Sequence, residues 1–377
     1  MPRTIIDIHI IQTVPPSNLN RDDTGSPKSA VYGGTRRARV SSQAWKRATR
    51  DAFATLLDSS ELGVRTKRVV ELIGDEIEAQ DASLAGRGQD LAKDLLAAAK
   101  IKTGPARKKD QPDEVGYLLF LSRKQVQNLA ALAVEAAAEA GEGKIALDGK
   151  KVKAVADREH SIDVSLFGRM VADDTALNVE ASAQVAHAIS VHAVANEFDY
   201  YTAVDDHKRG DDEEDAGAGM IGTVEFNSST LYRYANVDVD HLRGNLGDTE
   251  ATKRAVAAFL RAFVTSMPTG KQNTFANRTL PDAVLVVVRE TQPINLAGAF
   301  ESAVGEGEKG GRIAASIAKL AKQAKELHDA FGETPVAGWS FGVGERVDLL
   351  HEVATRSTLD AVVDEVVELV EQRQEQA

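Results

Sequence analysis

The pattern of apolar and polar positions predicts a strand at the beginning of the chain. Residues 4–13, TIIDIHIIQT, are rich in β-branched side chains and place isoleucines on both faces of a period-two pattern. Apolar residues on both faces are typical of a strand that is buried on both sides. We therefore expect this segment to be the first strand of a central sheet.

The period lengthens at Ser42, which predicts a helix running to about Leu57. Apolar residues recur there at steps of three and four, namely Trp45, Ala48, Ala52, Phe53 and Leu56. Ser41 or Ser42 is placed to cap the first turn, because a serine hydroxyl accepts hydrogen bonds from the free amides. The opposite face carries Gln43, Lys46, Arg47 and Arg50. The helix is expected to dock through one face and to present a cationic face.

The remaining pattern indicates a mixed α and β chain. Residues 58–140, rich in Ala, Leu, Glu, Lys and Arg, predict a helical insertion. Strands are expected to return at residues 183–194, 222–239 and 283–290. Further helices are predicted at residues 251–266 and 311–331, and an acidic amphipathic helix from about residue 358. Between the first two of these strands lies a polar, acidic segment that is rich in glycine.

Charge is segregated along the chain. The 377 residues contain 57 Asp and Glu against 45 Lys and Arg, a formal net charge of −12. Yet the stretch GGTRRARVSSQAWKRATR, residues 33–50, holds six cations and no acid: Arg36, Arg37, Arg39, Lys46, Arg47 and Arg50. We also expect no acidic residue one helical turn away from Lys46 or Arg47. A local cation cluster in an acidic chain indicates an anionic partner.

Two interpretations of this cluster are open. Serine hydroxyls, amides at a helix N-terminus and Arg or Lys side chains are the groups that position a phosphodiester backbone, which favours nucleic acid. The alternative is an ordinary solvated helix face. The aromatic residues do not decide between them, because Tyr232 and Tyr234 share one face of a predicted strand and either stack on bases or pack against a helix.

Signatures of catalysis, metal binding and membrane insertion are weak. The absence of cysteine excludes disulfides, zinc–thiolate sites and thiol nucleophiles. His187 and His192 lie five residues apart on a predicted strand and therefore project from opposite faces, which argues against a chelating pair. Asp205, Asp206 and His207 lie close together and are the remaining candidate metal cluster. We expect no catalytic residue, metal or cofactor.

The ends of the chain and its hydropathy lead to an expectation about location. The N-terminus has no signal-peptide pattern, and no apolar run approaches the length of a membrane span. We expect a cytoplasmic protein with no membrane partner.

Six motifs together resemble one protein family. They are LNRDD (19–23), GGTRRARVSSQAWKRATR (33–50), LFGRM (166–170), AHAISVH (186–192), YTAVDD (201–206) and LYRYANV (231–237). In this order they resemble the CasC family, the guide-RNA-binding backbone subunits of type I-E Cascade, a CRISPR surveillance complex. PTGKQNTFAN at 268–277 also fits.

The resemblance implies an α+β fold with three named parts. The palm is a ferredoxin-like or RRM-like antiparallel sheet, the fingers are a helical insertion, and the thumb is a protruding β-hairpin. The implied boundaries are 1–57 for the first part of the palm with the basic helix, 58–145 for the fingers, 146–195 for the middle of the palm, 196–224 for the thumb, and 225–377 for the rest of the palm with an acidic helix at its end. The thumb tip, 207–219, is strongly acidic and departs from the family, so we assign it no role.

The resemblance also implies a function and a set of partners. A non-catalytic subunit of this family polymerises along the CRISPR guide RNA and presents its bases for pairing with target DNA in antiviral defence. The implied partners are the guide RNA, target DNA through the guide, other copies of the chain, other Cascade subunits and a recruited helicase-nuclease. Two alternatives stay open: a guide-directed endoribonuclease that uses a loop aspartate, Asp22 or Asp23, and a stand-alone single-stranded RNA-binding protein.

The motif positions imply which residues contact the guide. Those on its phosphate backbone would be Arg21, Lys28, Ser41, Gln43, Lys46, Arg47, Arg50 and Lys271. Met170 would act as an apolar wedge against a base, its alternative role being core packing. Arg36, Arg37 and Arg39 precede the helix and would contact the guide, a neighbouring subunit or the target strand.

Overall fold

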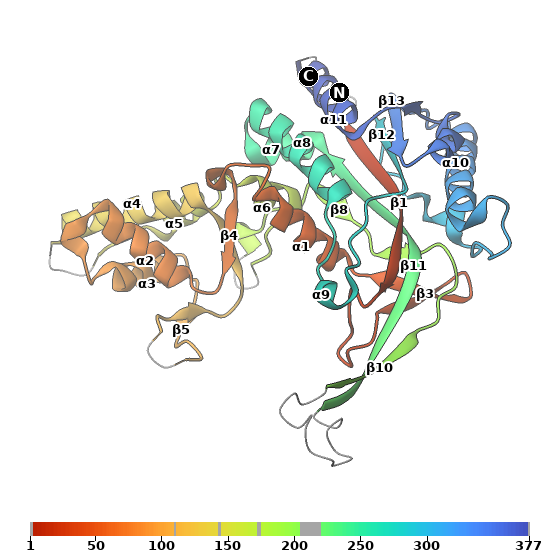
Figure 1. Cartoon of the computed structure of the whole chain (residues 1–377). Coiled ribbons are helices and arrows are strands. Elements are labelled where there is room, and N and C mark those ends of the chain that lie inside the picture. Colours follow the sequence, from red (N-terminus) through yellow and green to blue (C-terminus); the bar gives the residue numbers. More distant parts are fainter. Residues whose placement is uncertain (1–2, 109–110, 142–144, 172–174, 204–219, 376–377) are drawn as a thin grey trace, which may run out of the picture. The chain divides into compact units, whose positions relative to one another are not determined.

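The structure, a computed structural model, describes residues 3–108, 111–141, 145–171, 175–203 and 220–375. The chain divides into two compact units (Figure 1). Unit 1 comprises Met1–Ala52, Val185–Asn236 and Phe259–Leu369, and unit 2 comprises Phe53–Gln184, Val237–Ala258 and Val370–Ala377. The second unit therefore takes in two segments from the C-terminal half of the chain, whereas the boundaries implied by the resemblance follow the order of the sequence. Those boundaries stay a prediction.

Unit 1 is built on a large sheet, dominated by antiparallel pairs. Its strands are β1 (Ile5–Ser17), β2 (Ser29–Tyr32), β3 (Thr35–Val40), β8 (Ala183–Val185), β9 (Ala188–Ser190), β10 (Glu197–Ala203), β11 (Met220–Asp238), β12 (Ala283–Arg289), β13 (Ala337–Gly342) and β14 (Thr355–Arg356). The main order is β14-β13-β12-β1-β11-β9-β3-β2, with β10 paired to β11. The pairs β1–β12, β12–β13, β10–β11, β9–β11, β3–β9 and β2–β3 are antiparallel, and β13–β14 is parallel. The expected α+β class with an antiparallel sheet is confirmed at this level.

Strand β1 lies at the centre of the sheet, between β12 and β11, as its apolar pattern predicts. The side chains of Ile5, Ile6, Ile8, Ile10 and Ile11 are completely buried. In the register with β12, Ile5 faces Arg289 and Ile11 faces Ala283. The prediction of a strand buried on both sides is confirmed.

Helices cover the sheet of unit 1. They are α1 (Ser42–Phe53), α9 (Gln272–Phe275) and α10 (Gly311–Phe331), with the 3₁₀ helices Leu296–Phe300 and Glu345–Leu350. Helices α8 (Thr249–Thr265) and α11 (Leu359–Glu375) each run from one unit into the other. Ile317 and Leu320 of α10 pack with Leu285 and Val287 of β12 in one buried cluster. The predicted helices at 251–266, at 311–331 and from about 358 are all present.

Unit 2 is mainly helical within its described residues. Its helices are α2 (Val69–Gln80), α3 (Gly88–Ala98), α4 (Arg123–Ala140), α5 (Gly149–Ala156), α6 (Ile162–Phe167) and α7 (Val239–Leu246), with 3₁₀ turns at Ser59–Glu61, Ala82–Leu84 and Thr175–Leu177. Two small two-stranded antiparallel sheets pair β4 (Gly63–Thr66) with β7 (Leu119–Ser122) and β5 (Thr103–Gly104) with β6 (Glu114–Val115). Helix α4 begins with a capping box in which Ser122 and Gln125 bond each other's backbone amides. The expected helical character of residues 58–140 is confirmed.

Two local expectations are wrong. Residues 183–194 form two short strands, β8 and β9, instead of one. The helix that begins at Ser42 ends at Phe53, and Leu56 is 40% exposed instead of lying on the docked face. For Tyr232 and Tyr234 the sequence left stacking on bases and packing in the core open, and both side chains are buried in the core. Packing, the other interpretation of these tyrosines, is correct.

The phenol of Tyr234 belongs to a buried polar network that ties β11 and β12 to β1. Its hydroxyl donates to Asp7 Oδ1 at 2.7 Å, and Arg289 Nε donates to Asp7 Oδ2 at 2.8 Å. The amide of Ile294 also donates to Asp7, at 3.1 Å. Burial raises the pKa of Asp7, and the hydrogen bonds from Tyr234 and Arg289 oppose that shift. The network satisfies a carboxylate that the sheet would otherwise bury without partners.

None of the helices in the described part of the chain has both the length and the apolarity that a bilayer crossing requires.

Replacing Tyr234 with Phe should lower the free energy of unfolding by about 1–3 kcal/mol, because it removes one donor from a buried carboxylate. Chemical denaturation of the purified chain measures the change. Tyr200→Phe is the matched control, since Tyr200 is 64% exposed and should leave the stability unchanged. Equal effects of the two variants would contradict a stabilising role for the network.

Candidate nucleic-acid interface

Helix α1 docks onto the sheet through a tryptophan that covers a buried cation. Trp45 is 1% exposed. The guanidinium carbon of Arg233, in β11, lies 3.7 Å from the centroid of the Trp45 ring and 4.7 Å from that of Phe263 in α8. A guanidinium stacked on aromatic faces is attracted by the ring quadrupoles. Arg233 therefore joins the helix, the sheet and α8.

This cation has no carboxylate partner, and its buried Nε forms no hydrogen bond with the described residues. Arg233 Nη1 donates to Gln12 Oε1 at 2.5 Å, and Nη2 donates to the carbonyl of Phe263. Among the described residues no acidic side chain forms an ion pair with it. Burial lowers the pKa of Arg233 to about 9, so it remains charged at neutral pH. The contact fixes the rotation of α1 about its axis and directs the opposite face outward.

The beginning of α1 is held by Ser41 and Asn20. Ser41 Oγ accepts from the amide of Ala44 at 3.3 Å, and the Ser41 amide donates to Asn20 Oδ1 at 2.9 Å. Of the two expected caps, the structure therefore selects Ser41. Ser41 is only 6% exposed. Its hydroxyl caps the helix, and the RNA contact that the resemblance implies for Ser41 stays a prediction.

The outward face of α1 carries the four predicted polar residues. Gln43 and Arg47 are exposed, and Lys46 and Arg50 are half-buried. Burial lowers the pKa of Lys46, and a phosphate beside it would oppose that shift. The expectation that Arg47 has no acid one turn away is wrong, because its Nε lies 3.6 Å from Asp51. Both side chains are mostly exposed, at 85% and 68%, so the pair is weak.

Arg37 points into unit 1 and not to the surface. Its side chain is completely buried. Nε donates to Thr35 Oγ1 at 2.8 Å, Nη1 to the carbonyl of Ser190 at 2.9 Å, and Nη2 to the carbonyls of Phe300 and Glu301 at 2.9 and 3.2 Å. Arg37 thus links β3 to β9 and to the 3₁₀ helix at 296–300. Arg37 is therefore not part of the cationic surface, although the motif positions implied a contact with the guide, a neighbouring subunit or the target strand.

Lys28, Arg36 and Arg39 stay accessible beside the beginning of α1. Arg36 is exposed and its Nε donates to Ser29 Oγ at 3.2 Å. Arg39 is half-buried, and its Nε donates to the carbonyl of Ser29 at 3.3 Å. None of the three forms an ion pair with an acid in the described part of the chain. Each therefore keeps N–H groups that can bind an external anion.

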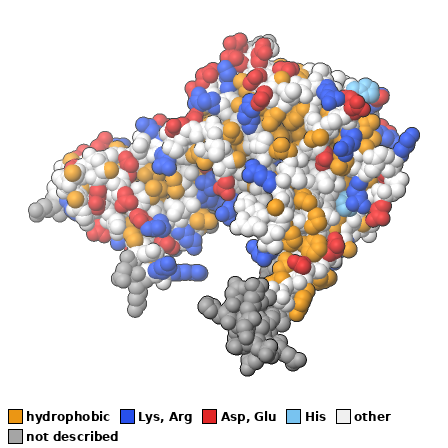
Figure 2. Space-filling model, in the orientation of Figure 1, with side chains coloured by type: hydrophobic (Ala, Val, Ile, Leu, Met, Phe, Trp, Pro, Cys, Tyr) orange, Lys and Arg blue, Asp and Glu red, His pale blue; other side chains and the backbone are white. Residues whose placement is uncertain are grey.

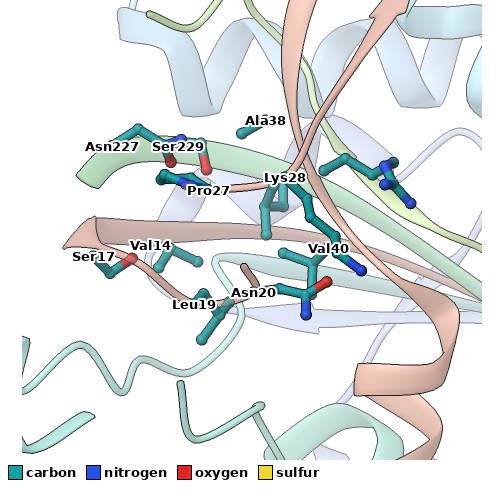
Figure 3. Close-up of a pocket in the computed structure, with 12 residues that line it drawn as sticks. Val14, Ser17, Leu19, Asn20, Pro27, Lys28, Ala38, Val40, Asn227 and Ser229 are labelled. Carbon is teal, nitrogen blue, oxygen red and sulfur yellow. The ribbon is translucent and has the colours of Figure 1, made fainter. Parts of the chain in front are cut away.

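A small pocket lies next to these cations. Lys28 and Asn20 point to the same side of it, and Ser17, Asn227 and Ser229 line it as well (Figure 3). Its volume is about 20 Å³, which is room for one water molecule. The pocket is too small for a metabolite. Its lining combines these polar side chains with apolar ones such as Val14 and Val40.

The loop that carries Lys271 lies against the loop that carries Arg21. A Cβ on Gly270 would come within 2.2 Å of the carbonyl oxygen of Leu19, so only glycine permits this approach. Arg21 is exposed and Lys271 is half-buried with a left-handed backbone, at φ 51°. The loops of both predicted cations therefore lie close to the segment that carries Lys28, whose amide donates to the carbonyl of Asn20 at 2.9 Å.

Met170 belongs to unit 2. Its side chain is 82% exposed, which excludes core packing, the alternative that the sequence left open. Its neighbour Arg169 is buried and bonds the carbonyls of Leu177 and Ala156 at 2.7 and 3.0 Å. The exposed apolar side chain of Met170 therefore directly follows a buried arginine whose side chain is held by hydrogen bonds.

The β10–β11 pair projects from the sheet of unit 1 as a two-stranded ribbon (Figure 1). Apolar side chains gather on it in Figure 2, and Phe198 and Tyr200 are 68% and 64% exposed. Asp205, Asp206, His207 and the acidic segment 207–219 lie outside the described residues. Within the residues described, no three His, Asp or Glu side chains converge as a metal site would require.

His187 lies beside the cations at the beginning of α1, and the sequence predicted no role in binding for it. Its Nδ1 lies 3.3 Å from Arg39 Nη1 and accepts from the Ser42 amide at 3.2 Å. These partners are 148 and 145 positions away in the chain, so no local pattern reveals the contact.

Replacing Trp45 with Ala should lower the free energy of unfolding by about 3–5 kcal/mol, because it removes a buried aromatic side chain and uncovers Arg233. Arg47→Ala on the opposite face of the same helix is the control and should leave the stability nearly unchanged. Thermal and chemical denaturation measure both. A Trp45 variant as stable as the control would contradict the docking of α1 through Arg233.

Comparisons with known proteins give one family and several similar structures. The model of the family described as CT1975-like protein matches residues 6–365. A chain of a solved "CRISPR RNA-guided surveillance complex, pre-nicking" is 35% identical, with a TM-score of 0.84 over 97% of this chain and 100% of that one. A chain of a "CRISPR RNA-guided surveillance complex" is 31% identical, with a TM-score of 0.72 over 97% and 99%. No curated protein matches.

Proposed function

Because the chain belongs to the CT1975-like protein family, we propose that it is an RNA-binding backbone subunit of a CRISPR surveillance complex of the Cascade type. Solved chains that match it over their whole length come from CRISPR RNA-guided surveillance complexes. The finer proposal is a type I-E CasC subunit with an RRM-like palm, helical fingers and a β-hairpin thumb. It has no catalytic role and acts beside a separate helicase-nuclease.

The observation that carries the proposal is the outward face of α1 together with the cations at its beginning. Lys46, Arg47 and Arg50 lie on one side of a helix whose other side is fixed by Trp45. Lys28 and Arg39 stand beside the first turn of α1. Several cations held at fixed spacing match a phosphate backbone, which positions a strand without reading its sequence. Bases are then left for pairing with a target.

The acidic net charge fits a subunit that stacks on copies of itself. Residues 21–50 contain eight Lys or Arg, whereas residues 345–377 contain nine Asp or Glu and three Arg. Asp364 and Glu368 of α11 are exposed. An acidic surface on one copy meeting a basic surface on the next is a heterologous contact, and such contacts generate open filaments. The RNA and the end subunits would set the filament length.

Copurification tests the proposal. We would express the chain with the other Cascade subunits and a CRISPR array, and then analyse the RNA held by the purified complex. The proposal predicts RNA of one discrete, guide-length size. A broad mixture of cellular RNA would favour a stand-alone single-stranded RNA-binding protein, and the absence of RNA would contradict both.

The endoribonuclease alternative rests on Asp22 and Asp23. Asp22 Oδ1 accepts from the Thr24 amide, the Thr24 hydroxyl and the Ser26 amide at 3.0, 2.7 and 3.0 Å, which gives it a role in the loop. Complementary RNA with Mg²⁺ should stay intact when it is added to the complex. Cleavage at regular intervals that is lost in Asp22→Asn or Asp23→Asn would overturn the non-catalytic proposal.

Changing Lys46 and Arg50 together to Ala should weaken RNA binding about equally for all sequences. The slope of log affinity against log salt should fall by about 1.4, since each phosphate contact on a single strand contributes about 0.7. Binding titrations at several salt concentrations measure it.

The matched control changes Lys322 and Lys325 to Ala, which removes two exposed cations from α10. The slope of this variant should equal that of the unchanged chain. An equal fall of the salt slope in both double variants would contradict a role of α1 in RNA binding.

A further inference from the structure

A histidine that no motif assigned to binding stands between the cations at the beginning of α1. His187 lies between β8 and β9, and its side chain is exposed. Its Nδ1 faces the Ser42 amide at 3.2 Å and Arg39 Nη1 at 3.3 Å. Two donors thus converge on one ring nitrogen.

This geometry determines the tautomer. A backbone amide and a guanidinium only donate, so Nδ1 must carry a lone pair and the proton must sit on Nε2. Burial, Arg39 and Lys28 all lower the pKa of His187, which keeps the ring neutral at pH 7 and above. His187 therefore adds an acceptor to this surface and no charge.

The acceptor restrains Arg39. Nε of Arg39 donates to the Ser29 carbonyl at 3.3 Å, and Nη1 is directed to His187. A guanidinium has five N–H groups, so three remain, and among the described residues these have no partner. Holding the guanidinium at two points reduces the entropy that it loses when it binds a phosphate.

The same contact determines which groups meet an anion. The first amide of α1 is already bonded to His187 Nδ1, so a phosphate at this end of the helix would contact the side chains of Arg39 and Lys28 and not the Ser42 amide. An arginine with its orientation fixed in advance offers a bidentate contact.

We propose that His187 is a positioning residue of the RNA-binding surface, whose neutral ring holds the Arg39 guanidinium against the beginning of α1 for a contact with one backbone phosphate. The inference rests on the proposed function, because it assigns a role within the same surface.

The test uses the chain assembled with its partner subunits and compares His187→Ala, His187→Asn, Arg39→Ala and the His187→Ala/Arg39→Ala double variant. Affinity for single-stranded RNA is titrated at several salt concentrations at pH 8, where His187 is neutral. His187→Ala removes no charge, yet it should lower the salt slope by about 0.7, as Arg39→Ala does. The double variant should be no weaker than Arg39→Ala alone.

His187→Asn provides the rescue, because the asparagine oxygen can take the acceptor position of Nδ1. Its slope and affinity should return toward those of the unchanged chain. Nitrogen NMR of the imidazole should show the proton on Nε2, and thermal unfolding should show that all variants stay folded.

Three outcomes would overturn the inference: weaker binding by His187→Ala with an unchanged salt slope, additive losses in the double variant, or a proton on Nδ1. If His187→Ala binds as the unchanged chain does while Lys46→Ala/Arg50→Ala weakens binding, only this inference fails. If the unchanged complex holds no RNA, the proposed function fails.

Discussion

The interface that we propose depends on one buried contact, the guanidinium of Arg233 between the rings of Trp45 and Phe263. A cation without a carboxylate partner is costly to bury, and here two aromatic faces, an amide and a carbonyl offset that cost. Because Trp45 lies over this cation, α1 has only one rotation that keeps its ring buried. Lys46, Arg47 and Arg50 then project from the opposite side. The buried contact between Trp45 and Arg233 therefore determines which cations of α1 face outward.

Arginine has two separate roles in unit 1. Arg37, Arg233 and Arg289 are among its largest fully buried side chains, and each joins segments that lie far apart in the chain. Arg36 and Arg39 stay accessible, only one or two positions from Arg37. Because guanidinium stays charged and carries five donors, it can bond several carbonyls at once or bind phosphate. The number of cations in GGTRRARVSSQAWKRATR is thus larger than the number available at the proposed binding surface, because Arg37 is buried.

Periodicity predicted the elements whose burial pattern is local. The isoleucines of β1 and the apolar repeat of α10 were enough to predict these two elements, because alternation or a 3.6-residue step determines which face is buried. Periodicity failed where contacts between distant segments determine which side chains are buried. The burial of Arg37 requires the carbonyls of Ser190 and Phe300, and His187 acts through residues more than 140 positions away. The motif resemblance predicted the partner class, and the structure shows which of the predicted side chains are accessible.

The central claim is that copies of this chain assemble on a guide RNA, with the α1 surface on its backbone. The most direct test is the mass of the purified complex, measured natively before and after ribonuclease treatment. The account predicts one RNA-containing assembly with several copies of the chain, which dissociates to smaller species when the RNA is digested. An assembly of unchanged mass and subunit number after complete loss of the RNA, or a complex with no RNA at all, would contradict it.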